Sequence, residues 1–229
     1  MRPFLPALPA LLALLAGPLL PVPCLAAGGH HAVDDASIDD PGQCNVELWA
    51  ERSNLDRRQL RHAGIGCNIL GVEAGLNADQ ETSRGAPSLH LRGVQLKWAT
   101  ALRPQLAIGL VAALGWQDQT PRSQQSLLVP LTWTPREDLA FHLNLGRSRL
   151  KGADDRTQRG VAVEWQMTPA WQALAEHFHD GERPLSRLGL RRTLSEQLTL
   201  DLSYARTAAT ARTPKEGWWT IGANWTFGQ

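Results

Sequence analysis

The stretch LAFHLNLGR, residues 139–147, decides the fold. Large apolar residues alternate in it with small or polar ones. Because successive side chains of a β-strand point to opposite faces, this order predicts a strand with one apolar and one polar face. The same alternation recurs in the runs 106–116, 127–133, 161–167, 198–204 and 219–227. The chain is therefore predicted to be all-β.

The segments between the runs differ in length in a regular way. Short turns (101–104, 135–138, 168–170, 194–197) alternate with longer polar loops (78–87, 118–123, 151–156, 180–183, 207–215). This layout is typical of a transmembrane β-barrel, with short turns at one rim and longer loops at the other. The strands of a soluble sandwich or lipocalin-like barrel would also alternate apolar and polar residues. Its short and long loops need not alternate along the chain, however, and its apolar face would point inward.

The tryptophans gather near the predicted strand ends. Indole rings favour the boundary between membrane and water, so this placement predicts two aromatic girdles. The residues near a short turn or the chain end are Trp98, Trp133, Trp165, Trp171 and Trp225, and those near the opposite rim are Trp116, Trp218 and Trp219.

The strand count follows from parity. Nine strands fit between Ser88 and Gln229. Bacterial barrels normally have an even number of strands, so residues 44–77 must supply one or three. Three strands, at 44–52, about 58–66 and 69–77, give a single antiparallel barrel of about twelve strands over residues 44–229. Ten strands remain the alternative if 44–66 lies outside the wall.

The first 43 residues are predicted to be a signal peptide followed by a flexible segment. Residues 1–27 have a positive start, a Leu- and Ala-rich stretch and small residues near Ala27, which is typical of a secretory signal peptide. Residues 28–43 lack periodicity and end in Pro41-Gly42, so we expect a flexible periplasmic segment. Imidazole and carboxylate groups could bind a divalent ion there, but the lack of periodicity favours a loose lead without a metal; the groups are His30, His31, Asp34, Asp35, Asp39 and Asp40.

Two cysteines remain after the predicted cleavage, Cys44 and Cys67. An exported chain meets an oxidising compartment, where an even pair is a disulfide candidate. The three-strand assignment puts both at one rim on neighbouring strands, so we expect a Cys44–Cys67 bridge.

Charge and hydropathy exclude two other classes. The 23 basic and 22 acidic residues leave a net charge of +1, without the basic footprint of a nucleic-acid-binding protein. After the signal no apolar run approaches the length of a transmembrane helix.

The polar faces of the strands would line the lumen if the apolar faces meet lipid. Their charges have both signs, with acids slightly ahead, so they could brace a narrow barrel or line a polar path for a small solute. The predicted lumen residues are Glu47, Glu73, Gln95, Lys97, His142, Asn144, Glu164, Glu176, Arg187, Arg191 and Asp201.

An enzyme would need a nucleophile and a base within reach. The candidate pairs are His142 with Ser148 or Ser203, and His177 or His179 with Ser186. The chain has no GxSxG elbow, and we predict no catalytic residue.

Two stretches resemble known families. Asp34-Asp35-Ala36, followed by CNVELWAER at 44–52, resembles the opening of proteobacterial outer-membrane barrels, some of which are labelled as phenol-degradation-pathway proteins. Residues 218–229 resemble the C-terminal signal of outer-membrane barrels, although Gly228 and Gln229 follow the last aromatic residue. The resemblance implies an outer-membrane barrel inserted by the barrel-assembly machinery.

These expectations combine into a barrel in the outer membrane of a Gram-negative cell, in contact with its lipid and without a cofactor. A passive channel for small solutes is the first hypothesis. A structural or interaction barrel with a filled lumen is the alternative, and a lipid-modifying enzyme is less favoured.

Overall fold

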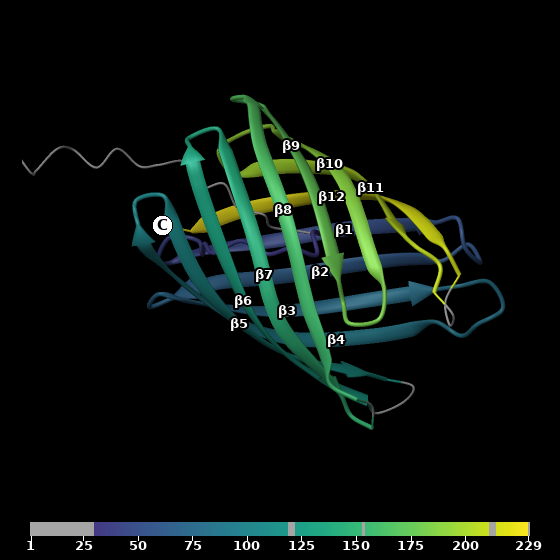
Figure 1. Ribbon diagram of the computed structural model, residues 1–229. Helices are drawn as coiled ribbons and strands as arrows, with labels where there is room; N and C mark the ends of the chain where they lie inside the picture. The colour runs from purple at the N-terminus through teal and green to yellow at the C-terminus, as the bar shows by residue number, and fades with distance from the viewer. Residues whose placement is uncertain (1–29, 119–121, 153, 211–213, 229) are drawn as a thin grey trace, which may run out of the picture.

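Twelve antiparallel strands close into one barrel in the computed structural model, which describes residues 30–118, 122–152, 154–210 and 214–228 (Figure 1). Each strand pairs with its neighbours in the chain, and β1 pairs with β12 to complete the ring. The larger predicted strand count is therefore confirmed. The strands are β1 Gln43–Ser53, β2 Gln59–Ile69, β3 Val72–Thr82, β4 Leu89–Arg103, β5 Leu106–Gln117, β6 Arg122–Arg136, β7 Leu139–Leu150, β8 Arg156–Thr168, β9 Trp171–His179, β10 Pro184–Thr193, β11 Leu198–Thr207 and β12 Glu216–Gly228.

The two rims of the barrel differ, as the spacing of the runs predicts. One rim carries the short connections and the ends of the ring at Gln43 and Gly228, and we call it the turn end. The other, the loop end, carries the longer connections. At the turn end Leu70 and Gly71 have φ of 55° and 85° and form a two-residue hairpin turn. This turn extends β2 to Ile69 and moves β3 to 72–82, so the predicted bounds 58–66 and 69–77 are corrected.

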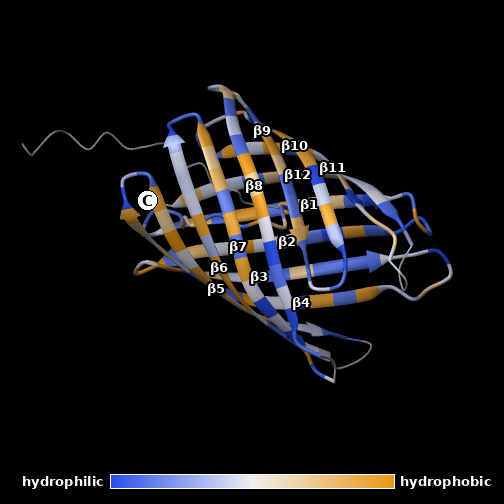
Figure 2. Cartoon of the chain, in the orientation of Figure 1, coloured by the Kyte–Doolittle hydropathy of each residue, from blue (hydrophilic) through white to orange (hydrophobic). Residues whose placement is uncertain are grey.

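The wall is apolar outside and polar inside. Figure 2 shows the strands banded in alternating hydropathy, as side chains of period two require. Leu143 is 41% exposed and Leu200 is 41% exposed on the outer face, whereas Glu164 is fully buried inside. A soluble barrel would reverse this order, so the inward-facing apolar core of the alternative is absent among the described residues.

Most of the predicted tryptophan girdles point outward. Trp133 and Trp225 are half exposed near the turn end, and Trp219 is 58% exposed nearer the loop end. Trp218 is different, because it is only 5% exposed and its Nε1 donates to Glu51 Oε1 at 2.9 Å. Neighbouring residues of a strand face opposite sides, so Trp218 and Trp219 cannot both meet lipid. The prediction for Trp218 was wrong.

Cys44 and Cys67 form the predicted disulfide. They lie directly opposite each other in the register of β1 and β2 near the turn end. No helix among the described residues is long and apolar enough to span a membrane. The predicted signal peptide lies outside the described residues.

Candidate functional site: the barrel lumen

Residues 30–42 run inside the barrel, and we call them the lumen segment. Val33 is fully buried, Asp35 is 1% exposed and Ala36 is 5% exposed. The segment is the purple trace enclosed by the strands in Figure 1. It leaves β1 at the turn end, and its hydrogen-bond partners lie on β3, β4, β6, β9, β10 and β11. The expected flexible periplasmic segment is thus corrected: it lies inside the barrel and is hydrogen-bonded to the inward face of the wall.

A buried ion-pair cluster holds the middle of the segment. Lys97 Nζ on β4 lies 2.7 Å from Asp34 Oδ1 and 2.8 Å from Asp35 Oδ1. Asn144 on β7 lies against the Asp34 backbone; with its amide oxygen turned toward Asp34 N, it accepts at 2.6 Å and donates to Asp34 O at 2.8 Å. The hydrogen bonds from Lys97 to the two carboxylates are charge-assisted, and such bonds are stronger than those between neutral groups.

A second cluster holds the start of the segment. Glu176 Oε2 on β9 accepts from Ala32 N at 3.0 Å and from Val33 N at 2.9 Å. Arg187 on β10 donates to the His30 carbonyl and pairs with Glu176 at 3.1 Å. One carboxylate and one guanidinium therefore bind both the segment and each other.

Neutral groups complete the contacts. His30 Nε2 lies 2.7 Å from Ser203 Oγ on β11, and Ala36 N donates to Thr132 Oγ1 on β6 at 2.8 Å. Near the turn end Asn45 Nδ2 donates to Asp39 Oδ2 at 2.5 Å. The segment is thus attached along its length by polar contacts, with Val33 and Ala36 buried among them.

Inward-facing glycines make room for it. A Cβ at Gly160 on β8 would lie 2.7 Å from Val33 Cγ2, closer than real contacts allow. A Cβ at Gly189 on β10 would lie 3.4 Å from His31 Cε1. Glycine at these wall positions leaves a groove that a larger side chain would fill.

The lumen remains open beside the second half of the segment, toward the turn end. A cavity of about 480 Å³ lies there, and residues 37–40 of the segment line one side of it. Its other side is polar and includes Lys97 on β4, Gln172 on β9 and Arg191 on β10. Arg191 is itself held by Asp201 at 2.8 Å.

The loop end carries a separate network built from wall and loop residues. Arg58 lies 2.6 Å from Glu216 and 3.3 Å from Glu51, and its guanidinium covers the Trp218 ring at 5.4 Å. Burial lowers the pKa of Arg58, but the hydrogen bond to Glu216 and the nearby carboxylates outweigh it and raise the pKa above its usual value. The guanidinium therefore stays charged. We call this group, with Arg183 and its 3.4 Å contact to Glu216, the loop-end network.

The structure places the predicted lumen residues on the inward face. Besides those described above, Glu47 contacts His62, Glu73 contacts the backbone of Asp39, and His142 contacts Thr132. Glu164 accepts from Gln172, and Gln95 is half-buried. What sequence reasoning missed is the lumen segment, Arg58 and the inward glycines. The available signal for the lumen segment was the adjacent pair Asp34 and Asp35, because two neighbouring carboxylates need a cation such as Lys97 when they are buried.

The other candidate chemistries find little support. His177 Nδ1 lies 2.9 Å from Ser186 Oγ, but on the exposed outer face, where the neighbouring backbone amides belong to the strand ladders. His142 contacts Thr132 instead of a serine. Among the described residues, no three His, Cys, Asp or Glu side chains are placed to hold one metal ion.

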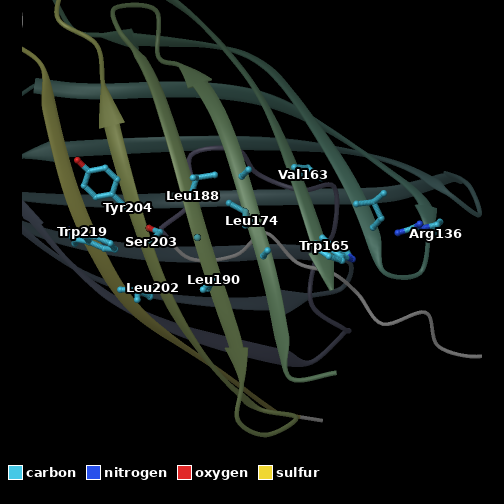
Figure 3. A pocket seen from close by; sticks show the side chains of 14 residues that line it. Arg136, Val163, Trp165, Leu174, Leu188, Leu190, Leu202, Ser203, Tyr204 and Trp219 are labelled. Carbon is cyan, nitrogen blue, oxygen red and sulfur yellow. The ribbon is translucent and has the colours of Figure 1, made fainter. Parts of the chain in front are cut away.

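A hollow larger than the lumen cavity lies on the outside of the wall. It has a volume of about 710 Å³ and lies over β7–β12, with Arg136 of β6 at its edge, and Leu188, Leu190, Leu202 and Tyr204 surround it (Figure 3). Its lining is almost wholly apolar, which suits lipid chains and not a polar solute.

The barrel is similar to solved porins. KdgM porin matches with a TM-score of 0.65 and 8% identity, covering 80% of this chain and 99% of that one. KdgM porin in complex with disordered oligogalacturonate matches with a TM-score of 0.66 and 8% identity, with the same coverage of 80% and 99%. NanC porin matches with a TM-score of 0.62 and 12% identity, covering 79% and 98%. At such identities the likeness shows a shared fold.

Sequence comparison assigns the family. No curated protein matches the chain significantly. The model of a family described as "Uncharacterised conserved protein UCP029691" matches residues 15–227. These matches give no support to the phenol-degradation label that the N-terminal resemblance suggested. The chain belongs to the UCP029691 family.

Proposed function

We propose that this protein is an outer-membrane channel for small polar solutes that its own lumen segment holds closed. The apolar outer wall requires hydrocarbon around it, and the shared fold with porins supports the outer membrane as the location. The loop end then faces outward and the turn end faces the periplasm.

One observation carries the proposal: the lumen is filled at mid-height by a polar segment and not by the wall alone. Val33 and Asp35 are buried between opposite sides of the barrel, which stops a solute at that level. The contacts that hold the segment are hydrogen bonds and ion pairs, which water can replace when the segment leaves.

The charge of the wall indicates the class of solute. Every Asp and Glu of the twelve strands faces the lumen, whereas the lumen-facing Lys and Arg whose side chains are described are fewer: Lys97, Arg156, Arg187 and Arg191. Neutral or cationic polar solutes therefore suit the open lumen better than anions. For this reason we do not propose an anionic sugar such as the oligogalacturonate in the KdgM complex as the solute of this protein.

Planar-bilayer conductance tests the proposal. In one variant, residues 30–39 are replaced by a Gly/Ser stretch of equal length, so that the polypeptide length is kept and the contacts are lost. We expect the native barrel to be closed most of the time, and the variant to conduct in steps with cation selectivity in a salt gradient. Arg58→Met is the control, because it removes a lumen charge without touching the segment.

A structural barrel with a filled lumen is the second candidate, and the fully buried Asn144 and Glu164 favour it. A replaced-segment variant that inserts and stays as silent as the native protein would support that candidate. A native barrel that conducts freely would contradict the closed state.

A further inference from the structure

The inner face of the wall carries the carboxylates of the strands, and the charged residues of the outer face are arginines. Every carboxylate of the strands faces inward, so no Asp or Glu within the described strands points to lipid. The outward-facing charged residues of the strands are arginines instead. Near the loop end they are Arg52, Arg61, Arg92, Arg147, Arg149, Arg159 and Arg206, all of them exposed.

These arginines form a row along the loop-end rim. Each lies within three residues of the loop end of its strand. An Arg facing lipid costs about 2–4 kcal/mol at the bilayer midplane and about 0–1 near the interface, so the row belongs at the level of the headgroups. Arg92 pairs with Asp118 and Arg149 with Asp155, but among the described residues the other five have no acidic partner.

An apolar groove lies directly below part of the row. It has a volume of about 500 Å³ on the outer wall over β4–β7, and Leu96, Leu114 and Leu127 line it. Arg147, Arg149 and Asp155 line the same groove, and because Asp155 pairs with Arg149, Arg147 is the arginine left for an anionic headgroup. A groove of this composition matches an acyl chain that ends in an anionic headgroup.

We propose that the arginine row binds the phosphate groups of an acylated, phosphorylated lipid in the leaflet at the loop end, with an acyl chain in the groove over β4–β7. One guanidinium group can donate two parallel hydrogen bonds to the oxygens of one phosphate group. Partial desolvation at the headgroup level strengthens these hydrogen bonds. Solute in the lumen cannot reach these side chains. The proposal rests on the proposed membrane location and is independent of conduction.

The test uses the full mature protein in phosphatidylcholine nanodiscs that contain either lipid A or its dephosphorylated form. Native mass spectrometry counts the bound glycolipid. We expect lipid A to bind the native protein, and Arg147→Gln with Arg159→Gln to weaken binding about tenfold, since two charge-assisted contacts are lost. The matched control, Arg103→Gln with Arg192→Gln, removes two exposed arginines near the turn end and should bind as the native protein does.

A second variant keeps the charge. Arg147→Lys with Arg159→Lys should retain part of the binding, and a folded barrel in each variant is checked by its resistance to heat in detergent. Equal binding of the dephosphorylated lipid, or equal loss in both Gln pairs, would overturn the proposal. A barrel that fails to enter any nanodisc would instead contradict the proposed membrane location.

Discussion

Two polar networks lie in the lumen at two heights, and only the one at mid-height closes it. At the loop end, Arg58, Glu51, Glu216 and Trp218 belong to the wall or to the loop that joins two strands. At mid-height the closing part is the lumen segment, joined to the wall covalently only through Gln43. The loop-end network cannot be removed without disturbing the strands, whereas the lumen segment can leave as a unit. Opening should therefore depend on mid-height contacts and not on the loop-end network.

The largest effect is expected at Lys97. Lys97→Met leaves Asp34 and Asp35 buried without their cation, and removing one partner of a buried ion pair costs about 3–5 kcal/mol. The segment should leave the lumen, with rapid hydrogen exchange of the peptide that covers residues 30–42 and an increase in conductance. The triple variant with Asp34→Asn and Asp35→Asn should recover part of the protection; a triple variant as exposed as Lys97→Met would argue against the ion pairs as the cause.

A smaller release is expected from filling the groove. Gly160→Val puts side-chain atoms where Val33 Cγ2 and, on β9, Phe178 Cδ2 lie, and overpacking of this kind costs about 1–3 kcal/mol. Exchange of the lumen segment should rise, and that of the strands away from β8 and β9 should not. Gly115→Val is the matched control, because a Cβ there would approach Arg92 and Gln124 but no residue of the segment. Identical exchange in the two variants would disprove the groove.

Glu176→Gln should loosen only the start of the segment. The amide keeps one acceptor for Ala32 N and Val33 N but loses the charge that pairs with Arg187, a net loss of about 1 kcal/mol. Exchange at residues 32 and 33 should rise while that at Ala36, which donates to Thr132, stays low. Uniform exchange across 30–42 would mean that the segment moves as one rigid unit.

The smallest effect on closure is expected at the loop end. Arg58→Met leaves Glu51 and Glu216 without their closest cation, and should lower the temperature at which the barrel unfolds in detergent. Exchange of the lumen segment should be unchanged. If this variant releases the segment as readily as Lys97→Met does, the two networks are coupled and the contrast between them fails.

The wall could be predicted from the sequence, and its filling could not. Alternation in stretches such as 139–147 determines which face meets lipid, because one period of two runs through each strand. It correctly placed His142 and Asn144 inward. The lumen segment has no periodicity, and its partners Lys97, Glu176 and Ser203 are distant in sequence, so no local pattern indicated them. Trp218 was misplaced because position near a strand end was weighed above the alternation with Trp219.

Cross-linking measures the position of the lumen segment most directly. Ala36 N lies 2.8 Å from Thr132 Oγ1, so cysteines introduced together at positions 36 and 132 should be joined by a short thiol–thiol cross-linking reagent in the folded barrel, detected by mass spectrometry of non-reduced peptides. The account predicts the 36–132 linked peptide beside an intact Cys44–Cys67 bridge. Two free thiols at 36 and 132 in a barrel that keeps its Cys44–Cys67 bridge would contradict it.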